Sequence, residues 1–140
     1  MLPNAPKSST RALDIGCAVG GTSFHLSKHF DEVVGVDFSQ QFVDAAEKMR
    51  AQGGMPYDVF TEGTERVELT AQLPEGANVE RCLFTQGDAC DMRPALEAIA
   101  SKKGAVGVEQ FDVILGSNLL CRLPSPRAFL SSLYSLQPTN

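Results

Sequence analysis

The sequence has few of the features that mark nucleic-acid-binding or membrane proteins. Only 12 of its 140 residues are Lys or Arg, against 17 Asp and Glu, so the formal net charge is −5. Phosphate contacts need a surplus of basic side chains, and this balance therefore argues against non-specific nucleic-acid binding. Apolar runs extend for only a handful of residues, whereas a membrane-spanning helix needs about 20. We therefore expect no membrane segment.

The cysteine and histidine spacing does not favour a metal or disulfide protein. None of the four cysteines forms a C-x-x-C pair, which argues against a zinc knuckle and a thioredoxin-type site. His25 and His29 lie four residues apart, but no carboxylate or cysteine at a suitable spacing completes a metal site. The N-terminus lacks a basic region followed by an apolar stretch, so we expect no signal peptide. Together these absences predict reduced thiols, no metal and a cytoplasmic location.

Length and the rhythm of elements predict one α/β domain over residues 1–140. Short β-rich runs alternate with helical patterns, which is typical of βαβ units and a parallel sheet. Ser39 and Ser125 are good helix N-caps, and Pro126 follows the second of them at the first helical position. Strands are expected at 11–15, 32–37, 81–85 and 111–116, and helices at 22–30, 40–52, 92–103 and from 126 onward.

Apolar stripes at helical spacing predict which face of each of the last three helices is buried. They comprise Phe42, Ala45, Ala46 and Met49 in the second helix, Leu96, Ile99 and Ala100 in the third, and Phe129, Leu130, Leu133 and Leu136 in the fourth.

Residues 55–80 interrupt the alternation of strands and helices. Two short extended pieces, 57–61 and 66–71, flank a Glu-Gly pair. Val67, Leu69 and Ala71 alternate with polar residues, a pattern typical of a half-buried strand. We expect a hairpin insertion here.

The segment Leu13-Asp-Ile-Gly-Cys-Ala-Val-Gly20 carries the strongest chemical signal. Glycines at a strand-to-helix turn allow a ligand to approach the backbone closely. A dinucleotide-binding loop reads G-x-G-x-x-G, but here Ala18 stands in the middle position. Asp14, just before the turn, would repel a pyrophosphate and attract a cationic ligand. S-adenosylmethionine, which carries a sulfonium and an ammonium group and no phosphate, satisfies both conditions.

Polar residues follow the other three strands at their carboxyl ends, where open α/β sheets bind ligands. Asp37 can accept both hydroxyls of a ribose, or it is a solvated aspartate at the end of a strand. Asp88 can accept from an exocyclic adenine amine, although either Asp88 or Asp91 could instead cap the next helix. Asn118 follows the fourth strand.

With these residues in place, the sequence resembles the class I S-adenosylmethionine-dependent methyltransferases. LDIGCAVGG resembles their glycine-rich motif, GVDFS the acidic motif after the second strand, QGDA the adenine motif and FDVILGSNLL the fourth-strand motif. The resemblance implies a Rossmann-like sheet of order 3-2-1-4 and S-adenosylmethionine as cofactor. The cofactor-binding residues that it implies are Asp14, Gly16, Cys17, Ala18, Gly20, Asp37, Phe38, Asp88, Ala89 and Asn118.

A narrower resemblance extends to the methyltransferase module of ovothiol biosynthesis, a 4-mercaptohistidine N1-methyltransferase. The segments QGDAC and RLPSPRAFL carry it. It implies a small thiol-bearing histidine as methyl acceptor, with Asn118 and Arg122 on the acceptor side. An imidazole has an unperturbed pKa of about 6.5, so a strong base is not obligatory, and the sequence identifies no catalytic residue.

The family's sheet has seven strands, and the sequence contains no counterpart of the fifth, sixth and seventh. Two alternatives to an active methyltransferase therefore stay open. One is a non-catalytic, truncated methyltransferase fragment that keeps part of the cofactor pocket. The other is a nicotinamide-dependent oxidoreductase, which Asp14 and Ala18 disfavour. With no strand beyond it, the fourth strand forms an edge, and we expect self-association there.

Overall fold

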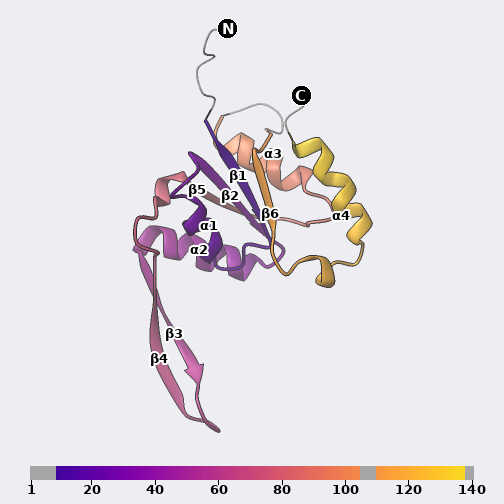
Figure 1. The fold of residues 1–140 in the computed structure, drawn as a ribbon. Helices are drawn as coiled ribbons and strands as arrows, with labels where there is room; N and C mark the ends of the chain where they lie inside the picture. The colour runs from indigo at the N-terminus through magenta and orange to yellow at the C-terminus, as the bar shows by residue number, and fades with distance from the viewer. Residues whose placement is uncertain (1–8, 105–109, 138–140) are drawn as a thin grey trace.

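A four-stranded parallel sheet forms the centre of the domain (Figure 1). The computed structural model describes residues 9–104 and 110–137. The strand order β5-β2-β1-β6 confirms the predicted order 3-2-1-4. All three neighbouring pairs are parallel. The strands are β1 (Arg11–Ile15), β2 (Glu32–Asp37), β5 (Cys82–Gln86) and β6 (Val113–Gly116).

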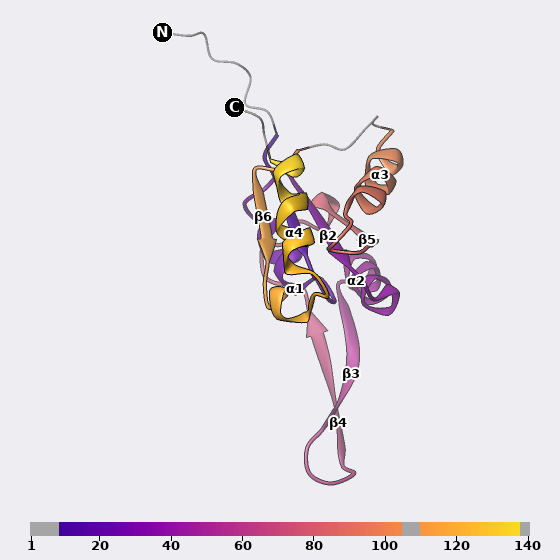
Figure 2. The same cartoon turned by 90° about the vertical axis from the view of Figure 1, so that its right-hand side faces the viewer.

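Helices cover both faces of this sheet (Figures 1 and 2). On one face, α1 (Gly21–Leu26) and α2 (Gln40–Gln52) pack through Phe24, Val43 and Met49. On the other, α3 (Arg93–Lys102) and α4 (Pro126–Leu133) pack through side chains such as Leu96 and Phe129. Burial on both faces explains why the central strands read as nearly continuous apolar runs.

The predicted helix caps are present. The Ser39 hydroxyl accepts from the Phe42 N–H, and the Ser125 hydroxyl accepts from the Ala128 N–H. Gly53 ends α2 in the left-handed region at φ +77°, a conformation that glycine adopts without a steric penalty.

Three helix details differ from the prediction. Helix α1 ends at Leu26 rather than at 30, because the Ser27 hydroxyl donates to the Phe24 carbonyl and the chain tightens into a turn. His29 therefore lies outside the helix. In α2, Val43 is buried whereas Phe42, which was predicted to be buried, is 47% exposed. The prediction failed because residues 42/46/49 and 43/46/49 both have helical spacing. Leu130 of α4 is likewise exposed rather than buried.

The interruption between α2 and β5 is an antiparallel hairpin of β3 (Gly54–Phe60) and β4 (Arg66–Gln72) that projects from the domain (Figures 1 and 2). Ala71 lies near its base and packs against the core. Val67 and Leu69 lie farther out and are 44% and 43% exposed. The prediction of a half-buried strand was thus wrong for these two residues, because the hairpin extends past the surface that it was expected to cover.

A short 3-10 turn, η1 (Val79–Arg81), leads from the hairpin into β5. Two further short turns, η2 (Leu120–Arg122) and η3 (Tyr134–Leu136), flank α4. Within residues 9–104 and 110–137, no helix has the length and apolar character that crossing a membrane requires.

Gly20 combines a left-handed backbone with a crowded Cβ position. Its φ is +88°, and a Cβ there would lie 2.8 Å from Phe84 Cζ and 3.1 Å from Phe24 Cε2. Both rings are buried. An alanine would therefore meet a backbone penalty and a steric one.

We expect Gly20→Ala to lower the free energy of unfolding by about 1–2 kcal/mol for the left-handed backbone and by a further ~1–3 kcal/mol for overpacking. Gly53→Ala is the matched control, because Gly53 shares the positive φ but has open space around its Cβ position. Urea unfolding of both variants measures the difference. Equal losses would contradict the account of the Phe84 contact.

Candidate cofactor site

The loop between β1 and α1 is held against β2 by backbone hydrogen bonds. The N–H groups of Gly16 and Cys17 both donate to the Val36 carbonyl, at 2.8 and 3.1 Å. Gly16 has φ +77°, and Ala18 follows at +48°. A left-handed alanine costs roughly 1–2 kcal/mol, so other contacts must hold the loop in this shape.

Asp37 supplies such a contact from the end of β2. Its Oδ2 accepts from the Ala18 N–H at 2.8 Å, and its Oδ1 accepts from the Ser39 N–H at 2.9 Å. A carboxylate has about four acceptor positions, so each oxygen keeps capacity for one further donor. Asp37 is thus more than a solvated aspartate: it joins the loop to the start of α2 and can still accept two hydroxyls.

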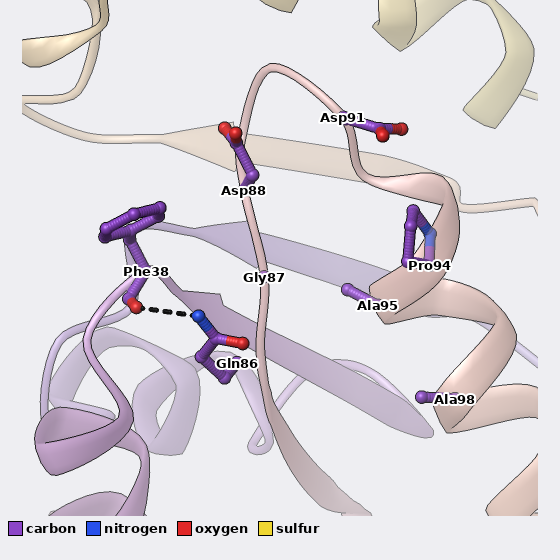
Figure 3. A pocket seen from close by; sticks show the side chains of 8 residues that line it. All are labelled: Phe38, Gln86, Gly87, Asp88, Asp91, Pro94, Ala95 and Ala98. Atoms are coloured by element: carbon purple, nitrogen blue, oxygen red, sulfur yellow. Dashed lines mark hydrogen bonds between the residues drawn. The ribbon is translucent and has the colours of Figure 1, made fainter.

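A pocket of about 300 Å³ opens next to Phe38, between the end of β5 and the start of α3 (Figure 3). Phe38, which is 73% exposed, flanks it on one side, and its carbonyl accepts from Gln86 Nε2 at 3.0 Å. Gly87 lies in the wall, where a Cβ would lie 2.6 Å from that of Ala95. The lining residues are Phe38, Gln86, Gly87, Asp88, Asp91, Pro94, Ala95 and Ala98.

Asp88 stabilises the turn that closes this pocket. Its Oδ1 accepts from the Cys90 N–H at 2.8 Å, and its carbonyl accepts from the Asp91 N–H at 3.0 Å. The residue before α3 is Met92, without a side-chain cap. The alternative of an aspartate that caps α3 is therefore wrong for both Asp88 and Asp91. Ala89 is buried in the core, so its side chain is not available to a ligand.

Asp14 lies behind the loop rather than in the pocket. Its side chain is 2% exposed, and its Oδ2 accepts from the Ser23 hydroxyl at 2.7 Å. Burial raises the pKa of this carboxyl, the Ser23 hydrogen bond lowers it, and the nearby Asp37 raises it again. A charge held in this low-dielectric position acts on a ligand at longer range than an exposed charge would.

Cys17, in the loop itself, is also buried. Burial raises the pKa of its thiol, and the carboxylates of Asp14 and Asp37 raise it further. Burial also raises the pKa of Cys82, to about 11. Both side chains are therefore neutral thiols that pack the core and are poor nucleophiles at neutral pH. Among the described residues, no group of three or more His, Cys, Asp or Glu side chains could hold a metal ion.

The segment after β6 lies over the glycine-rich loop. Leu119 packs close to Gly16, where a Cβ would lie 3.2 Å from Leu119 Cδ1. Its neighbour Asn118 has φ +52° and is exposed. Arg122, at the end of η2, is also exposed. Neither Asn118 nor Arg122 lines the pocket next to Phe38.

Sequence reasoning missed several of these positions. Ser23 carries a weak signal, a hydroxyl residue in the first turn after the loop. Gln86 stands in the QGDA segment but is not among the cofactor-binding residues that the resemblance implies. The α3 residues that line the pocket are small and apolar, and only the packing of α3 on β5 brings them there. They are Pro94, Ala95 and Ala98.

Nearly the whole chain matches a known protein family. A family model described as a methyltransferase domain matches residues 13–137. The chain belongs to the S-adenosylmethionine-dependent methyltransferases. The segments proposed for the cofactor all lie within the matched range.

Individual relatives are distant. The uncharacterized methyltransferase YcgJ of Bacillus subtilis is 26% identical over 94 residues, which are 67% of this chain and 36% of that protein. Ajmaline N-methyltransferase of Rauvolfia serpentina is 30% identical over 77 residues, 54% of this chain and 26% of that protein. The chain thus spans between a quarter and two fifths of the length of these curated relatives.

Solved structures share the fold. The crystal structure of Bacillus subtilis YcgJ superposes with a TM-score of 0.62 at 19% identity, covering 94% of this chain and 41% of that chain. The glycopeptide N-methyltransferase MtfA, complexed with S-adenosylmethionine, gives a TM-score of 0.60 at 15% identity, covering 95% of this chain and 45% of that chain.

The residues present fit the cofactor of this family. Phe38 offers an aromatic face for a purine, and Asp88 a carboxylate for its amine. Asp37 keeps acceptor capacity for two ribose hydroxyls. The pocket contains no basic side chain, which suits a ligand without phosphate.

Proposed function

We propose that this chain binds S-adenosylmethionine and forms the cofactor-binding part of an N-methyltransferase. The observation that carries the proposal is the Asp37 carboxylate, which holds the glycine-rich loop, while the next residue, Phe38, lines a pocket together with Asp88. The cofactor supplies a methyl group on a sulfonium, and this chain orients it. Positioning of the two reactants is the main contribution expected of the protein.

Each motif has a role in this proposal. Asp37 accepts the ribose hydroxyls, Phe38 packs on the adenine, and Asp88 accepts from the adenine amine while the Ala89 N–H donates to the ring. Asp14 balances the positive charge of the cofactor from behind the loop. The loop residues Gly16, Cys17, Ala18 and Gly20 provide the backbone along which it lies, and Asn118 borders its methyl end.

For the methyl acceptor we propose the imidazole of a thiol-bearing histidine, 4-mercaptohistidine. The support is the resemblance of QGDAC and RLPSPRAFL to the ovothiol-pathway module. Two relatives described above are N-methyltransferases by name, which is consistent with a nitrogen acceptor. Arg122, exposed after β6, is suited to pair with the carboxylate of such an acceptor.

The second candidate is a domain that binds the cofactor without turnover. The observation that favours it is the exposure of both residues proposed for the acceptor side, Asn118 and Arg122. Family membership disposes of the third alternative, a nicotinamide-dependent oxidoreductase.

The cofactor site is tested with Asp37→Ala. Each hydrogen bond to a charged group is worth roughly 1.5–3 kcal/mol, so losing even one lowers the affinity for S-adenosylhomocysteine by about ten- to a hundredfold. Asp44→Ala is the matched control, because it removes the same charge from the exposed face of α2. Calorimetric titration gives both dissociation constants. Unchanged affinity in Asp37→Ala would contradict the assignment.

The acceptor is tested with isotope-labelled cofactor and a panel of thiol-histidine, plain imidazoles, phenols and carboxylates. We expect preferred labelling of the thiol-histidine, with a KM that rises in Arg122→Ala and stays unchanged in Arg127→Ala, an exposed arginine on α4. Preferred labelling of a phenol would reject this acceptor and leave the methyltransferase proposal intact. Cofactor binding with no labelled product in any reaction would favour the second candidate.

We also propose that β6 pairs with a second copy of the chain. It is an edge strand within the described sheet, and its Val113 is 41% exposed. A lysine at an edge opposes such pairing, so Val113→Lys is expected to shift the chain toward monomer in sedimentation analysis. Leu130→Lys, at an exposed apolar position on α4, is the control and leaves association unchanged. A monomeric parent chain would contradict the proposal.

A further inference from the structure

Asp14 is a buried carboxylate without a cationic partner. It is 2% exposed, and within residues 9–104 and 110–137 no ion pair to it is present. The titratable groups that face it are Asp37 from the end of β2 and the Cys17 thiol from the loop. Neither supplies positive charge. An unpaired buried charge is costly, and a ligand that brings a cation to the loop removes that cost.

The Ser23 hydroxyl holds this carboxylate in place, with a smaller contribution from the Ser23 backbone. The Ser23 side chain is completely buried, and its Oγ donates to Asp14 Oδ2 at 2.7 Å. Ser23 lies in α1, nine residues after Asp14. The contact therefore joins both sides of the glycine-rich loop from underneath, on the face of the sheet that α1 covers.

Gly35 makes the space for this contact. It is the register partner of Asp14 on the neighbouring strand β2. A Cβ at Gly35 would lie 3.0 Å from Ser23 Oγ and 2.6 Å from Phe84 Cδ1. Any larger residue would push the hydroxyl or the ring aside, so the strand, the helix and the loop together define where the Asp14 carboxylate lies.

We propose that Ser23 is a positioning residue for the amino-acid end of the cofactor: its hydroxyl fixes the Asp14 carboxylate behind the loop, where the carboxylate attracts the ammonium group. The inference rests on the proposed function and extends it by naming the part of the cofactor on which Ser23 acts. Loss of a purely structural serine would lower the affinity for all fragments of the cofactor alike. Loss of Ser23 is expected to lower the affinity only for ligands that carry the ammonium group.

The proposal predicts a pH dependence with a defined sign. Burial and Asp37 oppose the ionised form of Asp14, whereas the Ser23 hydrogen bond favours it. Removing the hydroxyl raises the pKa of Asp14 further, so protonation, and with it the loss of attraction for a cation, begins at a higher pH. Affinity for an ammonium-bearing ligand therefore declines earlier in Ser23→Ala than in the parent chain as the pH falls.

The test compares two ligands by calorimetric titration of the 140-residue chain. S-adenosylhomocysteine carries the amino-acid end, whereas 5′-methylthioadenosine has the adenine, ribose and thioether without it. In Ser23→Ala we expect affinity for S-adenosylhomocysteine to fall by about tenfold or more and affinity for 5′-methylthioadenosine to stay unchanged. The difference is expected to widen as the pH is lowered, because protonation of Asp14 begins at a higher pH in the variant than in the parent chain.

Ser27→Ala is the matched control. Ser27 is equally buried and loses two hydrogen bonds, to the Phe24 carbonyl and from the Asn78 N–H, but it does not contact Asp14. It is expected to lower stability and leave the ratio of the two affinities unchanged. Asp14→Asn, nearly isosteric with the parent residue, is expected to lose the same ligand discrimination at every pH and provides the readout if Ser23→Ala does not fold.

Equal weakening of both ligands in Ser23→Ala, or weakening of neither, would overturn the inference while leaving the proposed function in place. Preserved discrimination in Asp14→Asn would overturn it as well. Failure of the parent chain to bind either ligand would instead overturn the proposed function, and the inference with it.

Discussion

The Asp37 carboxylate accepts one backbone N–H from the glycine-rich loop and another from the start of α2. Most of the site depends on this pair of hydrogen bonds. They hold Ala18 in a left-handed conformation that it would otherwise avoid, and they set the direction in which the chain leaves β2 toward Phe38. The two backbone N–H donors require two acceptor oxygens at the end of the strand, and a carboxylate supplies both. The same carboxylate keeps capacity for ligand hydroxyls.

A second constraint is the parallel sheet itself. Parallel pairing brings the carboxyl ends of all its strands to one edge, so the loops after β1, β2, β5 and β6 gather there although their residues are far apart in the sequence. Glycines in β2 and directly after β5 let the helices pack closely against the sheet. Gly35 admits Ser23 and Phe84 beneath the loop, and Gly87 lets β5 pass against Ala95 of α3.

The sequence was informative wherever a local rule applies. Apolar runs located the four strands of the sheet, serine caps located the starts of α2 and α4, and acids at strand ends located the edge where the site lies. Each of these signals lies within a few residues of the feature that it predicts, whereas the order of the strands was predicted from the family resemblance.

Features that depend on long-range packing could not be predicted. Spacing alone could not choose between Phe42 and Val43 for the buried face of α2. The alternation in β4 did not show that the hairpin projects beyond the core. Likewise, nothing near Asp14 in the sequence indicates that Ser23 meets it, because that contact requires the gap left by Gly35 on a different strand.

The residues proposed for the cofactor lie at the ends of β1, β2 and β5 and at the start of α3, whereas Asn118 and Arg122 on the proposed acceptor side are exposed. The central claim is that Asp37 holds the loop and the cofactor ribose at the same time. A crystal structure of the chain with S-adenosylhomocysteine tests it most directly. The account predicts both ribose hydroxyls on the Asp37 oxygens, with the Ala18 and Ser39 N–H groups still bound. A ribose placed elsewhere, or an Asp37 released from Ala18 to reach it, would contradict the claim.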